Sequence, residues 1–470
     1  MSSSRRRSQT RATVGWACLG ALLLWPLVLQ GAPLVFWDSN QYQAAGDGIW
    51  DHILGTSVSE SPEVTEGSGK SDPVEGGAST LRSPFYSVVV AASSRFGGSH
   101  VWVLLGHALC VCLVLACLWS EARPGASSRG GRDALPLVGV ALLSSLPVFT
   151  CYLMPDVFAG LLILCFVGFV ALSAQGPGWP RWGLAAVAFA AVLVHPSHLP
   201  LGVGLASVVS LPRVRSPAAP VSRLWMSWAP VLSGAMLMLA TSWFAFGEAT
   251  VAPKRLPVVL ARALEDGPTR RHVEAACAAD PDRYVLCRYI EDLPRRSGEI
   301  LFHEGGFSRI GERDLAAIRA EETQIVAAGV STGPLEQLRR SLLNVGAQLV
   351  KIGYEDIQLG DLRLDAFGRW LPKDEHDRGA FPRALLEPLQ WAVVLLSIAY
   401  IAARGGRGRS GGAERRALLV MVAGLLGNAL ICGGLSSPAD RYQSRVIWVV
   451  PVLAAWIWTR HRKELHDLSA

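Results

Sequence analysis

Charged residues are scarce in this chain. Only 17% of its 470 residues are Asp, Glu, Lys or Arg, whereas about a quarter are charged in an average soluble protein. Half of the residues are hydrophobic. They gather in uncharged stretches long enough to cross roughly 30 Å of hydrocarbon. This composition excludes a soluble globular protein and predicts an integral membrane protein.

The excess of basic over acidic residues is small and gives no sign of a nucleic-acid partner. The formal net charge is +6, and the basic residues stand in short runs between apolar segments. Such runs are typical of the cytoplasmic loops of membrane proteins. We therefore expect membrane lipids, rather than nucleic acid, around this chain.

The nine cysteines show no zinc-site or haem-attachment spacing. Seven of them lie inside apolar stretches, where cysteine behaves as a small packing residue. Cys277 and Cys287 differ because both fall in a long polar segment. They can form a disulfide if that segment faces an oxidising compartment, and the sequence does not decide between the disulfide and two free thiols.

Apolar runs predict an all-α polytopic protein with about ten transmembrane helices. One run, from Arg181 to Leu211, is too long for one crossing and too short for two full ones. We expect a hairpin of two short helices there, which turns at His195-Pro196-Ser197-His198. The other crossing segments are predicted at about 14–35, 100–119, 135–153, 157–174, 225–246, 384–403, 417–435 and 446–458.

The basic loops predict an inner (plasma) membrane protein with both termini in the cytoplasm. The division that follows is a cytoplasmic tail (1–13), a membrane domain (14–246) with a first outer loop (36–98), an outer or periplasmic domain (247–383), C-terminal transmembrane helices (384–459) and a cytoplasmic tail (460–470). Helical spacing at 314–328 and 335–350 predicts that the outer domain is mainly helical.

Ionisable residues at the predicted outer boundary are the first candidates for function, because charge near hydrocarbon is costly. Asp38 follows the first apolar run between aromatic residues, with Tyr42 four positions later. It is either part of a functional site or a helix cap within an interfacial aromatic belt. Arg82, two positions before Pro84 and four before Tyr86, either binds phosphate or extends to lipid headgroups.

Four further residues also have two interpretations each. Asp156 lies in the shortest predicted outer loop and is either functional or the cap of the next helix. His195 and His198 have a metal-like spacing without a third ligand nearby, and their imidazoles suit phosphate or proton transfer better. Arg441 follows Asp440 before the last apolar run, where the two either pair or serve a site.

Taken in order, these residues resemble the GT-C superfamily of membrane glycosyltransferases, in particular its protein-mannosyltransferase and aminoarabinose-transferase branch. The ordered features are Asp38 with Tyr42, Arg82-x-Pro84-x-Tyr86, Gly97-Gly98-Ser99, Pro155-Asp156, and the hairpin polar residues His195 and His198 where relatives often have Lys. The similarity covers about 13–211, with weaker support at Arg441. Paired acids are usual in the first loop of this branch, whereas here Ser39 follows Asp38.

The resemblance implies a sugar donor linked to polyprenyl phosphate, transferred with inversion to an acceptor on the outer face. Asp38 would be the catalytic base. Arg82, His195, His198 and Arg441 would stabilise the departing phosphate, and Asp156 would position the acceptor. The resemblance does not decide whether Asp38 and Asp156 hold a divalent cation, because metal dependence varies in the superfamily. The alternative is a non-catalytic flippase, export component or scaffold that binds lipid-linked sugars.

Overall fold

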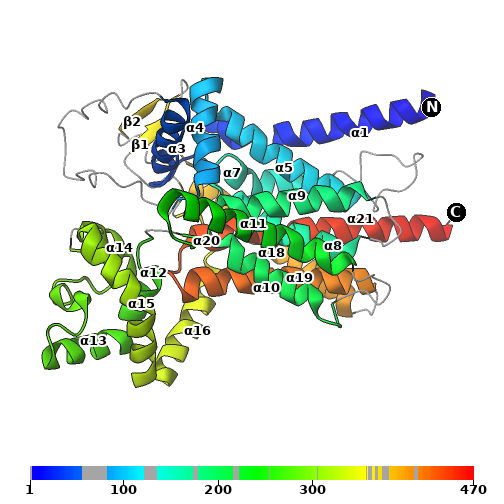
Figure 1. The fold of residues 1–470 in the computed structure, drawn as a ribbon. Coiled ribbons are helices and arrows are strands. Elements are labelled where there is room, and N and C mark those ends of the chain that lie inside the picture. The colour runs from blue at the N-terminus through cyan, green and yellow to red at the C-terminus, as the bar shows by residue number, and fades with distance from the viewer. Residues whose placement is uncertain are drawn as a thin grey trace.

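The computed structural model consists almost entirely of helices (Figure 1). It describes residues 3–55, 82–120, 135–172, 178–214, 222–252, 255–303, 305–355, 357, 362–365, 369–372, 381–406 and 411–469. Long apolar helices lie side by side in one bundle. The start of α1 (Ser3–Leu22) and the end of α21 (Val449–Ser469) lie at the same end of it. At the opposite end lie α3 (Ser39–Leu54), α4 (Pro84–Gly97) and a separate helical domain; we call this the α3 end.

Five helical segments of the described chain are long and apolar enough to cross a membrane, by length and composition. They are Thr13–Gln30 (the end of α1 with α2, Trp25–Gln30), Val101–Trp119 (α5), Leu224–Ala245 (within α11, Ser222–Phe246), Arg383–Gly405 (within α18, Arg383–Gly406) and Gly412–Gly434 (α19, Gly412–Ala429, with the π-turn Leu430–Gly434). The predicted all-helical architecture is confirmed, and these five segments support the prediction of a membrane protein. The predicted total of ten crossings is not confirmed.

A completely buried helix forms the centre of the bundle. The sequence of α8 (Val157–Ala171) is apolar on all sides of the helix, as a fully surrounded helix requires, and every one of its residues is buried. It packs against α5, α9 (Trp179–Val194), α10 (His198–Ser210) and α19. Gly160 allows one close approach, because a Cβ there would lie 2.4 Å from the Trp448 ring. α8 therefore holds its neighbours in place without needing lipid contact of its own.

The predicted hairpin is confirmed. α9 ends at Val194 and α10 begins at His198, so the chain turns at the expected His-Pro-Ser-His step. Pro196 lacks the backbone N–H that a continuous helix would use, which favours the break. Both helices are shorter than the helices of crossing length.

Several predicted boundaries are wrong. The apolar run at 135–153 is not one helix: α6 (Leu135–Leu143) stops before Ser144, and α7 (Leu146–Thr150) restarts with Pro147 in its first turn. The first crossing ends at Gln30, and Leu34 instead pairs with Tyr152 as an isolated parallel bridge. A polar helix, α20 (Asp440–Ile447), precedes the last apolar helix.

The helical domain comprises α12 (Val258–Asp266), α13 (Pro268–Ala279), α14 (Ser297–Phe302), α15 (Glu312–Thr332) and α16 (Pro334–Val350), with 3₁₀ turns at Val285–Arg288 and Phe307–Arg309. The predicted helical spacing at 314–328 and 335–350 is confirmed by α15 and α16. Its buried apolar side chains form a core distinct from that of the bundle. A short antiparallel hairpin, β1 (Leu362–Leu364) with β2 (Trp370–Pro372), follows it.

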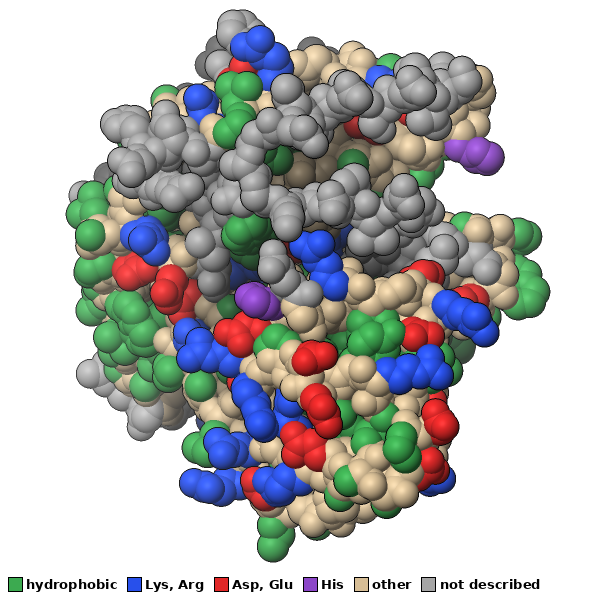
Figure 2. Space-filling view, turned by 90° about the vertical axis from the view of Figure 1, so that its left-hand side faces the viewer, with side chains coloured by type: hydrophobic (Ala, Val, Ile, Leu, Met, Phe, Trp, Pro, Cys, Tyr) green, Lys and Arg blue, Asp and Glu red, His purple; other side chains and the backbone are tan. Residues whose placement is uncertain are grey.

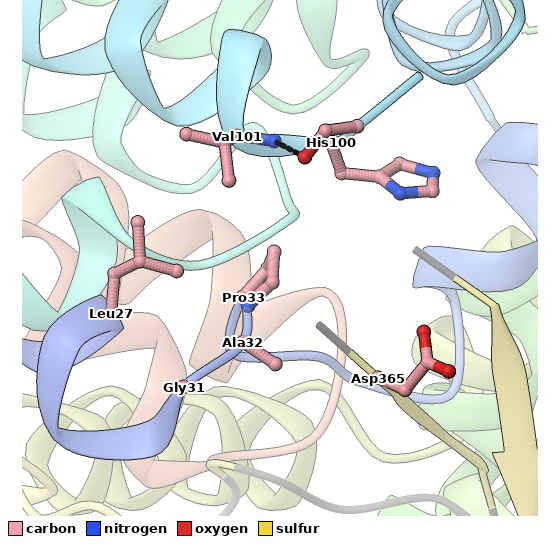
Figure 3. Close-up of a pocket in the computed structure, with 8 residues that line it drawn as sticks. Leu27, Gly31, Ala32, Pro33, His100, Val101 and Asp365 are labelled. Carbon is pink, nitrogen blue, oxygen red and sulfur yellow. Dashed lines mark hydrogen bonds between the residues drawn. The ribbon is translucent and has the colours of Figure 1, made fainter. Parts of the chain in front are cut away.

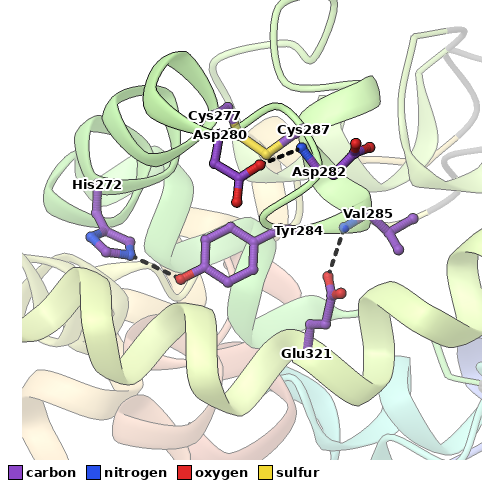
Figure 4. The surroundings of a disulfide bond; sticks show 8 residues. All are labelled: His272, Cys277, Asp280, Asp282, Tyr284, Val285, Cys287 and Glu321. Atoms are coloured by element: carbon purple, nitrogen blue, oxygen red, sulfur yellow. Dashed lines mark hydrogen bonds between the residues drawn. A yellow bond between two sulfur atoms is a disulfide. The ribbon is translucent and has the colours of Figure 1, made fainter.

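The two cysteines of the helical domain are bonded to each other. Cys277 at the end of α13 and Cys287 in the following 3₁₀ turn form a disulfide (Figure 4). Nearby, Tyr284 lies within 3.2 Å of His272, and the backbone N–H of Val285 donates to Glu321 of α15 at 3.0 Å. The disulfide and these hydrogen bonds fix a segment that contains little regular secondary structure.

Candidate functional site

The first two candidates are brought together by α3 and α4. Asp38 directly precedes α3, and its backbone carbonyl accepts a hydrogen bond from the N–H of Tyr42. Pro84 begins α4, since its fixed φ suits the first turn of a helix. The helices pack closely at Gly46, where a Cβ would lie 2.1 Å from the carbonyl oxygen of Ser87. This contact sets Arg82, at the start of α4, beside Asp38.

Asp38 and Arg82 form an ion pair. An Nη of Arg82 lies 2.5 Å from Asp38 Oδ1 and also donates to Gln41 Oε1 at 2.6 Å. The Arg82 side chain is 10% exposed and the Asp38 side chain 23% exposed. The carboxylate is thus held by a guanidinium but still reaches solvent.

A row of aromatic and polar rings leads from this pair into the bundle. The guanidinium of Arg82 lies 5.8 Å from the centre of the Tyr42 ring, which meets Tyr86 edge-on at 4.9 Å. The Tyr86 hydroxyl lies 3.3 Å from His107 Nε2, and His107 Nδ1 lies 3.1 Å from the carbonyl oxygen of Thr150. His107 is buried within α5. Tyr42, Tyr86 and His107 therefore form a continuous contact between the ion pair and α5.

Asp156 forms a second, deeper group with two arginines of α20. Its Oδ1 lies 3.3 Å from an Nη of Arg445 and 3.9 Å from Nε of Arg441. The Arg445 guanidinium also donates to Asn428 Oδ1 at 3.1 Å. The Asp156 and Arg445 side chains are each only 3% exposed. The interior of the bundle therefore contains a desolvated carboxylate between guanidinium groups.

Neither aspartate makes the cap hydrogen bond that was the rival interpretation. Asp38 and Asp156 stand at the N-cap positions of α3 and α8, but neither side chain bonds the first turn of its helix. Both side chains face arginines instead. Ion pairing, rather than capping, accounts for their orientation.

The two groups adjoin each other. The Arg441 guanidinium lies 3.8 Å from the centre of the Phe36 ring, two residues before Asp38. Buried Tyr42 interacts electrostatically with Asp38 and Arg82 on one side and with Asp156 and Arg441 on the other. The structure thus gathers residues from distant parts of the sequence into one cluster at the α3 end. We call Asp38, Tyr42, Arg82, Tyr86, Asp156, His195, His198, Arg441 and Arg445 the polar cluster.

The hairpin histidines contribute the remaining side chains of the polar cluster. Their ring centres lie 5.1 Å apart, and His195 interacts electrostatically with Arg82, Arg441 and Arg445. Nδ1 of His198 lies 2.7 Å from the carbonyl oxygen of Ala191, whereas its buried Nε2 has no hydrogen-bond partner in the described chain. A hydrogen bond from the Ser83 hydroxyl to the carbonyl of Leu193 ties this turn to the start of α4.

The residues present do not fit a divalent cation. Asp38 is paired with Arg82, and Asp156 faces both Arg441 and Arg445, so a metal ion at either carboxylate would lie beside positive charge. Among the described residues, no three His, Cys, Asp or Glu side chains gather as a metal would need. We therefore assign no step to a metal.

A small pocket, large enough for about one water molecule, lies beside the segment that leads to Asp38 (Figure 3). Leu27, Gly31, Ala32, Pro33, Ser99, His100, Val101 and Asp365 line it. His100 and Asp365 lie on the same side of it. Gln43 Oε1 bridges His100 and Trp370, at 2.8 and 2.7 Å, so the β1–β2 hairpin is attached to α3 at this point.

Two residues of this region were not predicted from the sequence. Arg445 was placed at the edge of the last apolar run, although its spacing of four from Arg441 puts both on one helical face. His107 was missed within the apolar run of α5, where a single ionisable side chain in a crossing segment was the available signal.

Comparison with known proteins adds no assignment. No protein-family model matches the chain, and neither curated proteins nor solved structures match it. The geometry of the polar cluster is therefore the main support for any functional proposal.

Proposed function

We propose that this protein is an integral membrane glycosyltransferase. It would transfer a sugar from a polyprenyl-phosphate donor to an acceptor on the outer face of the inner membrane. Both termini would then be cytoplasmic, and α3, α4 and the helical domain would be outside. The apolar segments α6–α7, α8, α9, α10 and the first part of α21 would complete about ten crossings of a GT-C-like fold.

The observation that carries the proposal is the charge of the polar cluster. Among the described residues, three guanidinium groups, those of Arg82, Arg441 and Arg445, gather around the carboxylates of Asp38 and Asp156. Positive charge in a poorly solvated site attracts an anion strongly, because the local dielectric is low. A lipid phosphate that gains charge as the sugar leaves fits such a site.

The chemistry balances with the residues present. The acceptor hydroxyl oxygen would bond to the anomeric carbon from the side opposite the phosphate, and its proton would pass to the Asp38 carboxylate. The bond between the anomeric carbon and the phosphate oxygen would break, with its electron pair going to that oxygen. Arg82, which touches Asp38, would stabilise this charge, and the configuration of the sugar would invert.

Tyr42 and Asp156 would position the groups that react, without taking part in the bond changes themselves. Tyr42 packs between Arg82 and Tyr86, so its ring would form part of the wall beside the donor. Asp156 holds Arg441 and Arg445 by charge and would orient them toward the phosphate. His195 and His198, at the hairpin turn, would supply hydrogen-bond donors on the remaining side.

One observation favours a second candidate, a non-catalytic protein that binds lipid-linked sugars. The Asp38 carboxylate is already in contact with Arg82 at 2.5 Å, so an acceptor hydroxyl would have to compete with that ion pair. In this alternative, the arginines would bind the phosphate and no bond would break.

Replacement of Asp38 tests the proposal. The gene would be deleted in its host and complemented with the wild type, Asp38→Asn or Asp51→Asn. Asp51 is a matched control, since it also pairs with an arginine of α4, Arg95, at 2.7 Å on the same helix as the site. Intact-mass analysis of envelope glycolipids and glycoproteins would measure the result.

We expect deletion to remove a sugar-sized mass, and wild type and Asp51→Asn to restore it. Asp38→Asn should lower its level at least 100-fold at equal protein expression, the usual scale for a lost general base. Full restoration by Asp38→Asn would disprove its role as the base. Unchanged glycans after deletion would favour the binding protein instead.

A further inference from the structure

α16 has an unusual position for a helix of a water-exposed domain. It runs across the direction of the long apolar helices, beside their ends at the α3 end of the bundle (Figure 1). It packs against the π-turn Leu430–Gly434 at the end of α19 and against α20. The C-terminal end of α16 is thus anchored at the bundle, and its other end projects away from the bundle next to α15 (Figure 1).

The polar side of α16 is turned toward the protein. Gln337 and Asn344 donate to the carboxylate of Asp266 at 2.6 and 3.1 Å. Gln348 exchanges two hydrogen bonds with the backbone of Ala439, at 2.9 and 3.0 Å. These residues follow one another at helical spacing, so they define one polar side, which is half-buried at Gln337 and Asn344 and buried at Gln348.

The apolar side of α16 is turned outward. Leu335, Leu338 and Leu342 are 81%, 56% and 63% exposed, and Val345 and Leu349 continue the same row. At about 100° per residue, these five side chains fall within an arc of roughly 80°. We call them the α16 stripe. A helix with a polar inner side and an apolar outer side reverses the pattern that water favours.

The α16 stripe is continuous with the exposed apolar surface of the bundle. Val345 and Leu430 both lie against Gly434, where a Cβ would be 3.6 Å from each side chain. Leu430 is 57% exposed, and Leu426, about one turn earlier in α19, is 47% exposed. α19 is a helix of crossing length, so its exposed leucines face lipid when it spans a membrane. The stripe extends that surface sideways at the end of the crossing.

We propose that α16 is an interfacial helix whose stripe is inserted into the membrane surface on the α3 side. Such helices lie in the plane of the membrane, with apolar side chains at the acyl boundary and basic residues at the headgroups. Arg339 and Arg340 are exposed on the remaining sides of α16 and suit anionic headgroups. The helical domain is then held against the bilayer next to the polar cluster.

The helical domain does not need the stripe for its own core. Leu260, Leu286, Phe307 and Ile318 are fully or almost fully buried there without contribution from α16. The polar side of α16, through Gln337, is what joins it to α12. Insertion of the stripe into lipid therefore leaves the packing of the domain unchanged.

Photocrosslinking tests this inference independently of the proposed function. The photoreactive residue p-benzoylphenylalanine would replace Leu338 in the full-length protein, and Ala347 in a matched control. Ala347 is exposed on the same helix but on the opposite side from the stripe. The proteins would be reconstituted in vesicles of phosphatidylcholine and phosphatidylglycerol, irradiated, and digested for peptide mass analysis.

We expect the position-338 peptide to gain the mass of one phospholipid, with a yield several-fold above that at position 347. Equal lipid yields at both positions would overturn the inference. So would crosslinks from position 338 to another protein chain, which would indicate that a second copy covers the stripe. Absence of any adduct at 338, with lipid adducts at a control position in α19 such as Leu426, would mean that the stripe faces water.

Discussion

Ion pairs of the polar cluster and ion pairs on the surface of the helical domain differ in their exposure to solvent. In the cluster, Asp156 and Arg445 are each only 3% exposed. In the helical domain, Arg271 and Glu336 approach to 2.5 Å, but their side chains are 60% and 39% exposed. The same chemical pair is therefore buried in one region and solvated in the other.

This difference indicates what each pair does. A solvated pair is screened and stabilises a fold little, so its loss is tolerated. A buried pair is costly to desolvate, and apolar residues of similar size often stabilise as well or better. Buried charge at the end of a membrane bundle is therefore better explained by binding or chemistry than by stability. The predictions below test this comparison.

The largest effect is expected for Asp156→Ala. The variant leaves Arg441 and Arg445 buried without their carboxylate, and removal of one partner of a buried pair costs about 3–5 kcal/mol. We expect the free energy of unfolding to fall by this amount, measured by titration with a denaturing detergent in mixed micelles. Asp51→Ala, which breaks the more exposed pair with Arg95, should change it by less than about 1 kcal/mol.

A double replacement sharpens the same test. Asp156→Leu combined with Arg445→Met removes both charges and keeps side-chain volume. If the pair serves function, this variant should recover most of the lost stability but not restore the glycan of a deletion strain. Recovery of the glycan would show that the buried pair is structural only.

The disulfide should have a smaller effect, confined to the helical domain. Cys277 and Cys287 are separated by 10 positions, and a crosslink that closes so short a loop stabilises by about 3 kcal/mol in the chain-entropy model. Cys277→Ser with Cys287→Ser should lower the urea midpoint for proteolysis within residues 258–350 of the full-length protein. An equal loss of stability in the bundle helices would contradict the separation of the two cores.

The hairpin and the helices of crossing length could be predicted because their signals are local. A Pro between two histidines interrupts an apolar run, and the chain turns there. The break at Ser144 was missed because the apolar pattern continues across it and Pro147 was the only local signal. Short helices within a bundle are stabilised by packing, which hydropathy does not report.

The candidate residues were found separately, but their pairing was not. Asp38 and Arg82 are 44 positions apart, and Asp156 and Arg445 are 289 apart. Their contacts depend on how α3, α4, α8 and α20 pack, and no spacing rule applies to helices brought together from distant segments. The disulfide was left open for a related reason, since pairing depends on the compartment as well as on the sequence.

The smallest expected effect is a pH response of the helical domain. The Tyr289 hydroxyl donates to Asp314 at 2.6 Å, and this hydrogen bond, with Arg288 nearby, lowers the pKa of Asp314 below its usual range. The pKa of Asp314 is therefore lower in the folded than in the unfolded protein. The ionised Asp314 stabilises the fold above about pH 4, and this stabilisation is lost as the pH falls through the pKa of Asp314 in the folded protein.

Tyr289→Phe removes the main cause of this shift. We expect the wild-type thermal midpoint to fall slightly more than that of the variant between about pH 7 and pH 3. The measurement would follow unfolding of the full-length protein in detergent. High salt should leave this difference largely intact, since a hydrogen bond is less screened than a solvated ion pair. A difference abolished by salt would assign the shift to the solvated charge of Arg288 instead of the hydrogen bond.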